Sequence, residues 1–297
     1  MEMFDLLAQL VVNGIIAGSI YALIALGFSI TYRTVKFFHF AHGVVYTAGA
    51  YLAYTFAISL GFDFLASFFL ATVLAAVLGL CIDRFVYSPL RQHKAPNLVF
   101  LIASFGIFIF IQNLIQLIYG AQILTLRTGP IKEGYQMFSA VITPIQIMIL
   151  AVSIVLMFAL WLLIQKTKMG KAMRAVADDP VGASVAGIYP ETTILTAFAI
   201  GSAAAGIAGI LISLETNIEP TMGFSAILKG MIASIIGGIG SIPGAMVGGF
   251  FLGIVENLGI WKIQAGWKDT ISFAVLILFL LFRPGGIFNV KAEPERI

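Results

Sequence analysis

Long apolar runs are the feature that most constrains this chain. A bilayer core of roughly 30 Å is crossed by about 20 apolar helical residues. Eight runs approach or exceed that length, and they cover Leu6–Ile30, Gly43–Leu60, Phe64–Ile82, Leu98–Tyr119, Ile142–Ile164, Thr192–Leu214, Ala226–Leu258 and Thr270–Phe282. The sequence therefore predicts an all-α integral membrane protein, a polytopic helix bundle of about eight hydrophobic segments.

The composition agrees with a lipid-facing surface. Of the 297 residues, 60% are hydrophobic and 10% are charged, whereas soluble domains are about half apolar and a quarter charged. No second soluble domain is visible, so we expect one transmembrane domain over residues 1–297. The net charge of +3 is explained by Lys and Arg collecting in cytoplasmic loops, so we expect no nucleic-acid partner.

The seventh run is too long for one span. As a continuous helix it would extend about 50 Å at 1.5 Å per residue. Its middle carries Gly237, Gly238, Gly240 and Pro243, and proline removes a backbone donor and clashes with the preceding turn. The sequence predicts two pieces joined at Gly240–Pro243, either a broken helix or two short spans, which would make nine crossings.

Loop charges predict the orientation. Nine basic residues fall in alternate loops, namely Arg33, Lys36, Arg84, Arg91, Lys94, Lys166, Lys168, Lys171 and Arg174. The opposite side has only Arg127 and Lys132 up to Gly223. The positive-inside rule places the N-terminus outside and the loop 165–191 in the cytoplasm. Arg283, Lys291 and Arg296 favour a cytoplasmic C-terminal tail, which agrees with nine crossings.

The loop 165–191 has two helix patterns. Met169, Ala172, Met173 and Val176 recur at helical spacing and predict an amphipathic helix that ends near Asp178. Asp179 followed by Pro180 is typical of an N-cap and first helical position, so a second helix over 181–186 follows, closed by Gly187. Two short interfacial helices can be a passive connector or a docking element for a soluble partner.

Small and polar residues within the runs are candidates for a solute pathway. Glycines four residues apart allow helix backbones to approach closely in lipid, while broken helices recur at transporter substrate sites. Polar groups in lipid are costly and mark function by default, although an amide often only bonds a neighbouring helix. The candidate lining residues are Asn13, Ser19, His42, Gln112, Asn113, Gly237, Gly238, Gly240, Glu256 and Asn257.

Charge within the runs indicates the kind of solute. We take Glu256 as the only intramembrane charge, and it lies near the end of its run. A mostly neutral pathway suits a neutral or zwitterionic solute better than an ion. His39 and His42 stand three residues apart, but no third ligand lies near in sequence, so we expect no metal site.

The chain has no recognisable catalytic or nucleotide-binding motif. Its one Gly-Lys pair, Gly170-Lys171, has Gln165 where a Walker A motif needs Gly and Ala172 where it needs Ser or Thr. We therefore expect a non-enzyme without a cofactor of its own.

Five stretches resemble the permeases of branched-chain amino-acid ABC importers, the LIV type. They are Asn13–Arg33 (NGIIAGSIYALIALGFSITYR), Phe40–Tyr51 (FAHGVVYTAGAY), Lys168–Ile188 (KMGKAMRAVADDPVGASVAGI), Ile235–Asn257 (IIGGIGSIPGAMVGGFFLGIVEN) and Phe282–Phe288 (FRPGGIF). The family usually shows Asn-Phe-Ala-His-Gly where this chain has His39 before Phe40-Ala41-His42-Gly43, a departure that alters local polarity.

The resemblance implies a division of labour. An extracytoplasmic binding protein would deliver a branched-chain or related hydrophobic amino acid, and two permease subunits, usually paralogues, would form the pathway. Two cytoplasmic ATPases would close on ATP, and the loop 165–191 would couple that closure to the helices. The coupling residues implied for this chain are Gly170, Arg174, Ala175, Asp178, Asp179 and Pro180.

Other functions remain open at this stage. Related members of the family serve urea or short amides. A self-contained channel or secondary carrier would need an internal repeat or a buried charge for ion coupling, and neither is clear in the sequence. An intramembrane enzyme would need a catalytic set that the sequence does not contain.

Overall fold

The computed structural model describes residues 2–127, 134–137 and 139–288, and within these it is a helix bundle with one small hairpin. The expectations for Lys132, Lys291 and Arg296 lie outside the described residues. The α-helices are α1 (Glu2–Val35), α2 (Ala41–Tyr54), α3 (Phe64–Ile82), α4 (Ser88–Gln92), α5 (Asn97–Tyr119), α6 (Pro144–Lys166), α7 (Lys168–Asp178), α8 (Pro180–Val185), α9 (Pro190–Glu215), α10 (Met222–Gly237), α11 (Ile242–Gly259) and α12 (Lys268–Phe282).

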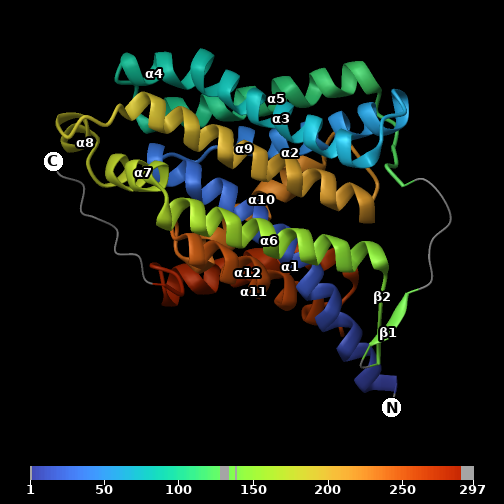
Figure 1. Cartoon of the computed structure of the whole chain (residues 1–297). Coiled ribbons are helices and arrows are strands. Elements are labelled where there is room, and N and C mark those ends of the chain that lie inside the picture. The colour runs from blue at the N-terminus through green and yellow to red at the C-terminus, as the bar shows by residue number, and fades with distance from the viewer. Residues whose placement is uncertain (1, 128–133, 138, 289–297) are drawn as a thin grey trace.

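Short elements complete the chain. Two π-helical turns, η1 (Thr55–Ser59) and η2 (Asp83–Tyr87), extend α2 and α3, and a 3₁₀ turn, η3 (Ala265–Trp267), precedes α12. Strands β1 (Tyr135–Met137) and β2 (Ala140–Ile142) pair antiparallel. In Figure 1 this hairpin and the N-terminus lie at the end of the bundle opposite to α7 and α8.

The prediction of an all-helical polytopic membrane protein is confirmed. Seven of the described helices are long and apolar enough to cross a membrane, by length and composition. The run Gly43–Leu60 is not among them, because it forms the 14-residue α2 followed by η1. The number of crossings and the side of the N-terminus stay predictions.

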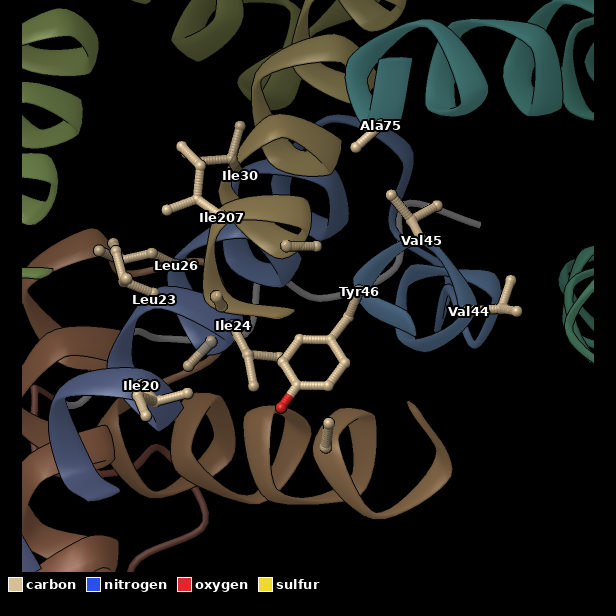
Figure 2. Packing of buried hydrophobic residues seen from close by; sticks show 14 of the residues in the cluster. Ile20, Leu23, Ile24, Leu26, Ile30, Val44, Val45, Tyr46, Ala75 and Ile207 are labelled. Carbon is tan, nitrogen blue, oxygen red and sulfur yellow. The ribbon is translucent and has the colours of Figure 1, made fainter. Parts of the chain in front are cut away.

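Helices α1 and α9 form the centre of the bundle. In the most apolar stretch of each helix, 67% of the residues are buried in α1 and 72% in α9. In the corresponding stretch that contains α12, only 6% are buried. Helices α3, α5, α6 and α12 therefore expose apolar side chains around this centre, as lipid-facing helices do. Figure 2 shows side chains that converge there, among them Ile24 of α1, Tyr46 of α2 and Ile207 of α9.

Glycines set the distance between α1 and α11, as their four-residue spacing predicts. A Cβ on Gly14 would lie 2.8 Å from the Ile254 backbone, and one on Gly18 would lie 2.8 Å from that of Phe250. Gly249 and Gly253 in turn face Ala22 and Gly18. Helices α1 and α11 thus touch backbone to backbone, a contact that any larger side chain would separate.

The seventh run is broken, as predicted. Helix α10 ends at Gly237 and α11 begins at Ile242, with Ser241 as an N-cap whose hydroxyl accepts from Gly244 N at 3.1 Å. Gly238 and Gly240 have φ of +109° and +80°, a region that favours glycine. A Cβ on Gly248 would collide with Ala233 and one on Gly237 with Gly244, so the two helices form a tight antiparallel hairpin.

The C-terminal segment closes this break. Ile287 N donates to Ile236 O at 2.8 Å and Phe288 N donates to Gly237 O at 3.2 Å. These bonds satisfy carbonyls at the end of α10 that have no partner within the helix. Two of the five family-like stretches, Ile235–Asn257 and Phe282–Phe288, therefore meet at one turn.

Candidate functional site

The loop 165–191 folds as the sequence predicts. Thr167 caps α7 by accepting from Gly170 N at 3.1 Å, and α7 ends at Asp178. Asp179 caps α8 by accepting from Val181 N at 3.0 Å, with Pro180 at the first helical position. Gly187 follows with φ of +82°. Local capping chemistry therefore determines where both helices begin and end.

Helix α7 is held against the ends of α6 and α1. A Cβ on Gly170 would collide with the backbone of Ile164, so glycine is required for this close approach. Arg174 donates to the carbonyl oxygen of Ile164 at the end of α6. Asp178 lies 3.9 Å from Arg33 at the end of α1. The loop is thereby attached to two long helices.

The apolar face predicted for α7 is partly covered by the rest of the chain. Met173 and Val176 are buried, together with Gly170 and Ala177, whereas Met169 is 44% exposed. The apolar face of α7 therefore reaches the surface at Met169. Ala175 is half-buried.

Helix α8 carries exposed apolar side chains at the far end of the molecule. Val181 is 75% exposed and Val185 is 87% exposed, and Tyr189 follows at 79%. Val181 and Val185 are four residues apart and therefore lie on one helix face. Figure 1 shows α8 projecting beyond the helix bundle. An apolar pair in this position is available to a partner.

A partly buried ion-pair network anchors the segment that follows α8. Arg91 donates to both carboxylate oxygens of Asp83 at 2.6 and 3.0 Å, and to Glu191 at 2.8 and 3.2 Å. Ser88 also donates to Glu191, at 3.2 Å. Asp83 is fully buried, so its charge is compensated by a bidentate guanidinium. This network fixes the first turn of α9 to η2 and α4.

A second charged cluster joins α1, α10, α11 and α12, and we call it the charged cluster. Lys229 Nζ lies 3.3 Å from Glu256 Oε2 and 3.2 Å from Asp269 Oδ1. Tyr21 donates to Glu256 Oε2 at 2.9 Å, Ser272 donates to Glu256 Oε1, and Lys229 donates to Tyr21 at 3.1 Å. Glu256 is fully buried and has bonds on both oxygens.

The statement that Glu256 is the only intramembrane charge was wrong. Lys229 lies inside α10, and its side chain is only 13% exposed. Its signal was present in the sequence, because a lysine inside an apolar run is expensive and needs a partner. What the sequence could not give is the partner, since Glu256 and Asp269 come from two other helices.

The candidate lining residues do not form one site. Glu256 belongs to the charged cluster, and Asn257 lies beside it, accepting from Lys268 Nζ at 3.1 Å. Gly237, Gly238 and Gly240 form the turn at the other end of the α10–α11 hairpin, where Gly240 lies near Arg33. Asn13 accepts from Gln9 at 3.0 Å, and Ser19 donates to the Ile16 carbonyl oxygen at 2.7 Å.

Other candidates lie on or beside α5 and α2. Asn113 is exposed on α5 and donates to Ile109 O at 2.8 Å, and Gln112 beside it is half-buried. His42 is fully buried and packs against Gly27 of α1. His39 is also buried, and its Nδ1 lies 3.0 Å from the Tyr87 hydroxyl. Among the described residues, no group of three His, Cys, Asp or Glu side chains could hold a metal ion.

Comparison with known proteins decides the family. Residues 10–280 match the family described as "Branched-chain amino acid transport system / permease component". The chain belongs to this permease family. The permease is 39% identical to the high-affinity branched-chain amino acid transport system permease protein LivH of Escherichia coli K12, over 100% of this chain and 99% of the relative.

Two further relatives are also branched-chain amino acid transport permeases by name. The permease is 38% identical to the high-affinity branched-chain amino acid transport system permease protein BraD of Pseudomonas aeruginosa, over 100% of this chain and 99% of the relative. It is 31% identical to the probable branched-chain amino acid transport permease protein LivH of Methanocaldococcus jannaschii, over 96% and 94%. The predicted resemblance is confirmed, and the permease is a multi-pass inner-membrane transport protein.

Proposed function

We propose that this permease translocates a branched-chain or related hydrophobic amino acid as one subunit of an ATP-driven importer. The observation that carries the proposal is similarity to such permeases along the whole chain, including 39% identity to LivH. The capped pair of helices α7 and α8 supports it from the geometry. ATP would be used by the partner subunits, since the sequence has no Walker A motif of its own.

The proposed docking element for the ATPase is the cytoplasmic pair α7 and α8, within the loop 165–191. Val181 and Val185 present an apolar face, and short helices bind grooves by such a face. Gly170 and Arg174 hold α7 on the end of α6, while Asp179 and Pro180 set the start of α8. Ala175 and Asp178 lie on the same element, which would carry movement of the ATPase to α6 and α1.

The second permease subunit would face α5. Gln112, Asn113 and Gln116 lie close together on this helix, and the last two are exposed. Amide side chains within a span are costly against lipid, so a protein surface suits this face better. A solute-binding protein would act at the opposite end of the bundle from α7 and α8.

The docking proposal is tested by co-purification with the ATPase subunits. Val181→Asp together with Val185→Asp should abolish recovery of the ATPase, because charges replace the apolar face. Val141→Asp is a matched control, since Val141 is 44% exposed at the other end of the molecule. Wild-type recovery of the ATPase with the double variant would refute the docking face.

The substrate is tested by uptake in proteoliposomes that hold the complete transporter. Labelled leucine, alanine and urea are compared with and without internal ATP. The proposal expects ATP-dependent uptake of leucine in preference to urea. Preferential uptake of urea would instead support the alternative permease for urea or short amides, and uptake without ATP would support a channel or secondary carrier.

A further inference from the structure

A cavity of about 440 Å³ lies between α10 and α12, beside the charged cluster. Its size is within the range of small-molecule sites. Phe224, Leu228, Ile232 and Phe273 supply apolar lining, while Lys229 and Asp269 supply opposite charges. An apolar cavity with two opposite charges at one place is complementary to a ligand that has an apolar part and carries both a positive and a negative charge.

The two charges face the cavity in different ways. Lys229 is mostly buried, and Glu256 and Tyr21 hold its ammonium group from behind at 3.3 and 3.1 Å. Asp269 is 64% exposed and contacts the same ammonium group at 3.2 Å. Lys229 is therefore fixed in place by Glu256, whereas Asp269 forms a solvent-accessible pair with it.

The Lys229–Asp269 pair has one solvent-exposed partner, since the Asp269 side chain is 64% exposed. Ion pairs that solvent reaches add little stability, so a ligand with its own two charges can insert between the two side chains at little cost. The cation would then bind the ligand's carboxylate and the anion its ammonium group. Glu256 keeps its bonds to Tyr21 and Ser272 throughout, which makes it a positioning residue.

We propose that this cavity, framed by Lys229 and Asp269, binds the zwitterionic head of a hydrophobic amino acid during its passage through the permease. The aliphatic side chain of the ligand packs on Phe224, Leu228 and Phe273. The proposal rests on the proposed transport function and assigns that function a site. It also explains why charged side chains stand beside an apolar cavity within the membrane segment of the chain.

The first test is the maximal rate of leucine uptake by the complete transporter in proteoliposomes at saturating binding protein. Asp269→Asn removes one charge-assisted bond and should lower the rate about tenfold. Asp63→Asn is the matched control, because Asp63 caps α3 through its bond to Leu65 N at 3.0 Å and asparagine caps equally well. A wild-type rate for Asp269→Asn would overturn the proposal.

The second test measures occupancy without the binding protein. Ser225 lines the cavity and is exposed, so Ser225→Cys in a Cys81→Ala background offers a thiol for a membrane-impermeant methanethiosulfonate reagent. Leucine should slow the labelling, while 4-methylpentanoate and isoamylamine, which each carry one of its two charges, should not. Equal protection by either analogue, or no protection by leucine, would contradict the site.

Failure of the proposed transport function and failure of the proposed cavity site give different results. Loss of the proposed function appears as no ATP-dependent leucine uptake by the wild-type transporter. Loss of this site alone appears as normal wild-type uptake together with a full rate for Asp269→Asn and unprotected labelling. Recovery of the ATPase during purification is measured for every variant, so a fall in uptake is interpreted only in assembled complexes.

Discussion

The two ends of the α10–α11 hairpin are held by different chemistry. At the turn end, Gly237–Ser241, backbone atoms bond backbone atoms, and Ile287 and Phe288 donate to the carbonyls that end α10. At the other end, the charged cluster joins the helices through the side chains of Lys229, Glu256 and Asp269. The turn has no room for side chains, so its backbone hydrogen bonds hold it in one conformation. The ionic side chains at the other end can instead exchange partners.

That difference suits the two ends to the separate roles proposed for them. The turn end lies near Arg33 and hence near α7, because Gly240 approaches Arg33 and Arg33 pairs with Asp178. A rigid turn would suit the proposed transmission of movement from α7 and α8. The charged end would suit the proposed binding and release of a zwitterionic amino acid. Four substitutions test this contrast, from the largest expected loss of stability to the smallest.

Lys229→Met should be the most damaging change, because it leaves the fully buried Glu256 without its cation. Removing one partner of a buried pair costs about 3–5 kcal/mol. The measurement is the thermal unfolding midpoint of the purified permease in detergent. Lys229→Met combined with Glu256→Gln should recover part of the loss, and an additive double variant would argue against direct pairing.

Gly237→Ala should damage the turn end. The added methyl group would collide with the Gly244 carbonyl, which belongs to the facing helix and has little room to move. Overpacking of this kind costs about 1–3 kcal/mol, measured again as a lower unfolding midpoint. Gly106→Ala is the control, since nothing lies within 4 Å of its Cβ position. If both variants lower the unfolding midpoint equally, close packing at Gly237 does not explain the loss of stability.

Ile287→Pro should have a smaller effect at the same end. Proline removes the N–H that donates to Ile236 O at 2.8 Å, at a cost of about 1 kcal/mol for one hydrogen bond. Ile287→Ala keeps the donor and removes the side chain. If the alanine variant unfolds at a lower temperature than the proline variant, side-chain packing rather than the backbone bond closes the turn.

Asp269→Asn should be nearly neutral for stability. The carboxylate is 64% exposed, and pairs of this type contribute less than about 1 kcal/mol. An unchanged unfolding midpoint together with slower leucine uptake would separate a role in transport from a role in folding. A large fall in the midpoint would show that Asp269 is as structural as Glu256.

The sequence alone predicted the elements whose signals are local. Apolar runs mark helices that face lipid, because hydrocarbon requires a continuous apolar surface and internally bonded backbone. The end of α7 and both ends of α8 follow from Asp179, Pro180 and Gly187, each acting within a few residues, whereas the start of α7 at the Thr167 cap was not predicted. The break in the seventh run follows from its length, glycines and proline in the same way.

Only the tertiary structure decided which side chains meet. Lys229 and Glu256 are 27 residues apart, and Arg91 and Glu191 are 100 apart. Such pairs depend on how whole helices pack, and that packing is set by backbone contacts at glycines such as Gly18 and Gly253. The sequence therefore determined that this chain is a membrane permease with a pair of short helices in the loop 165–191. The packing of its helices placed a cation and an anion at one apolar cavity.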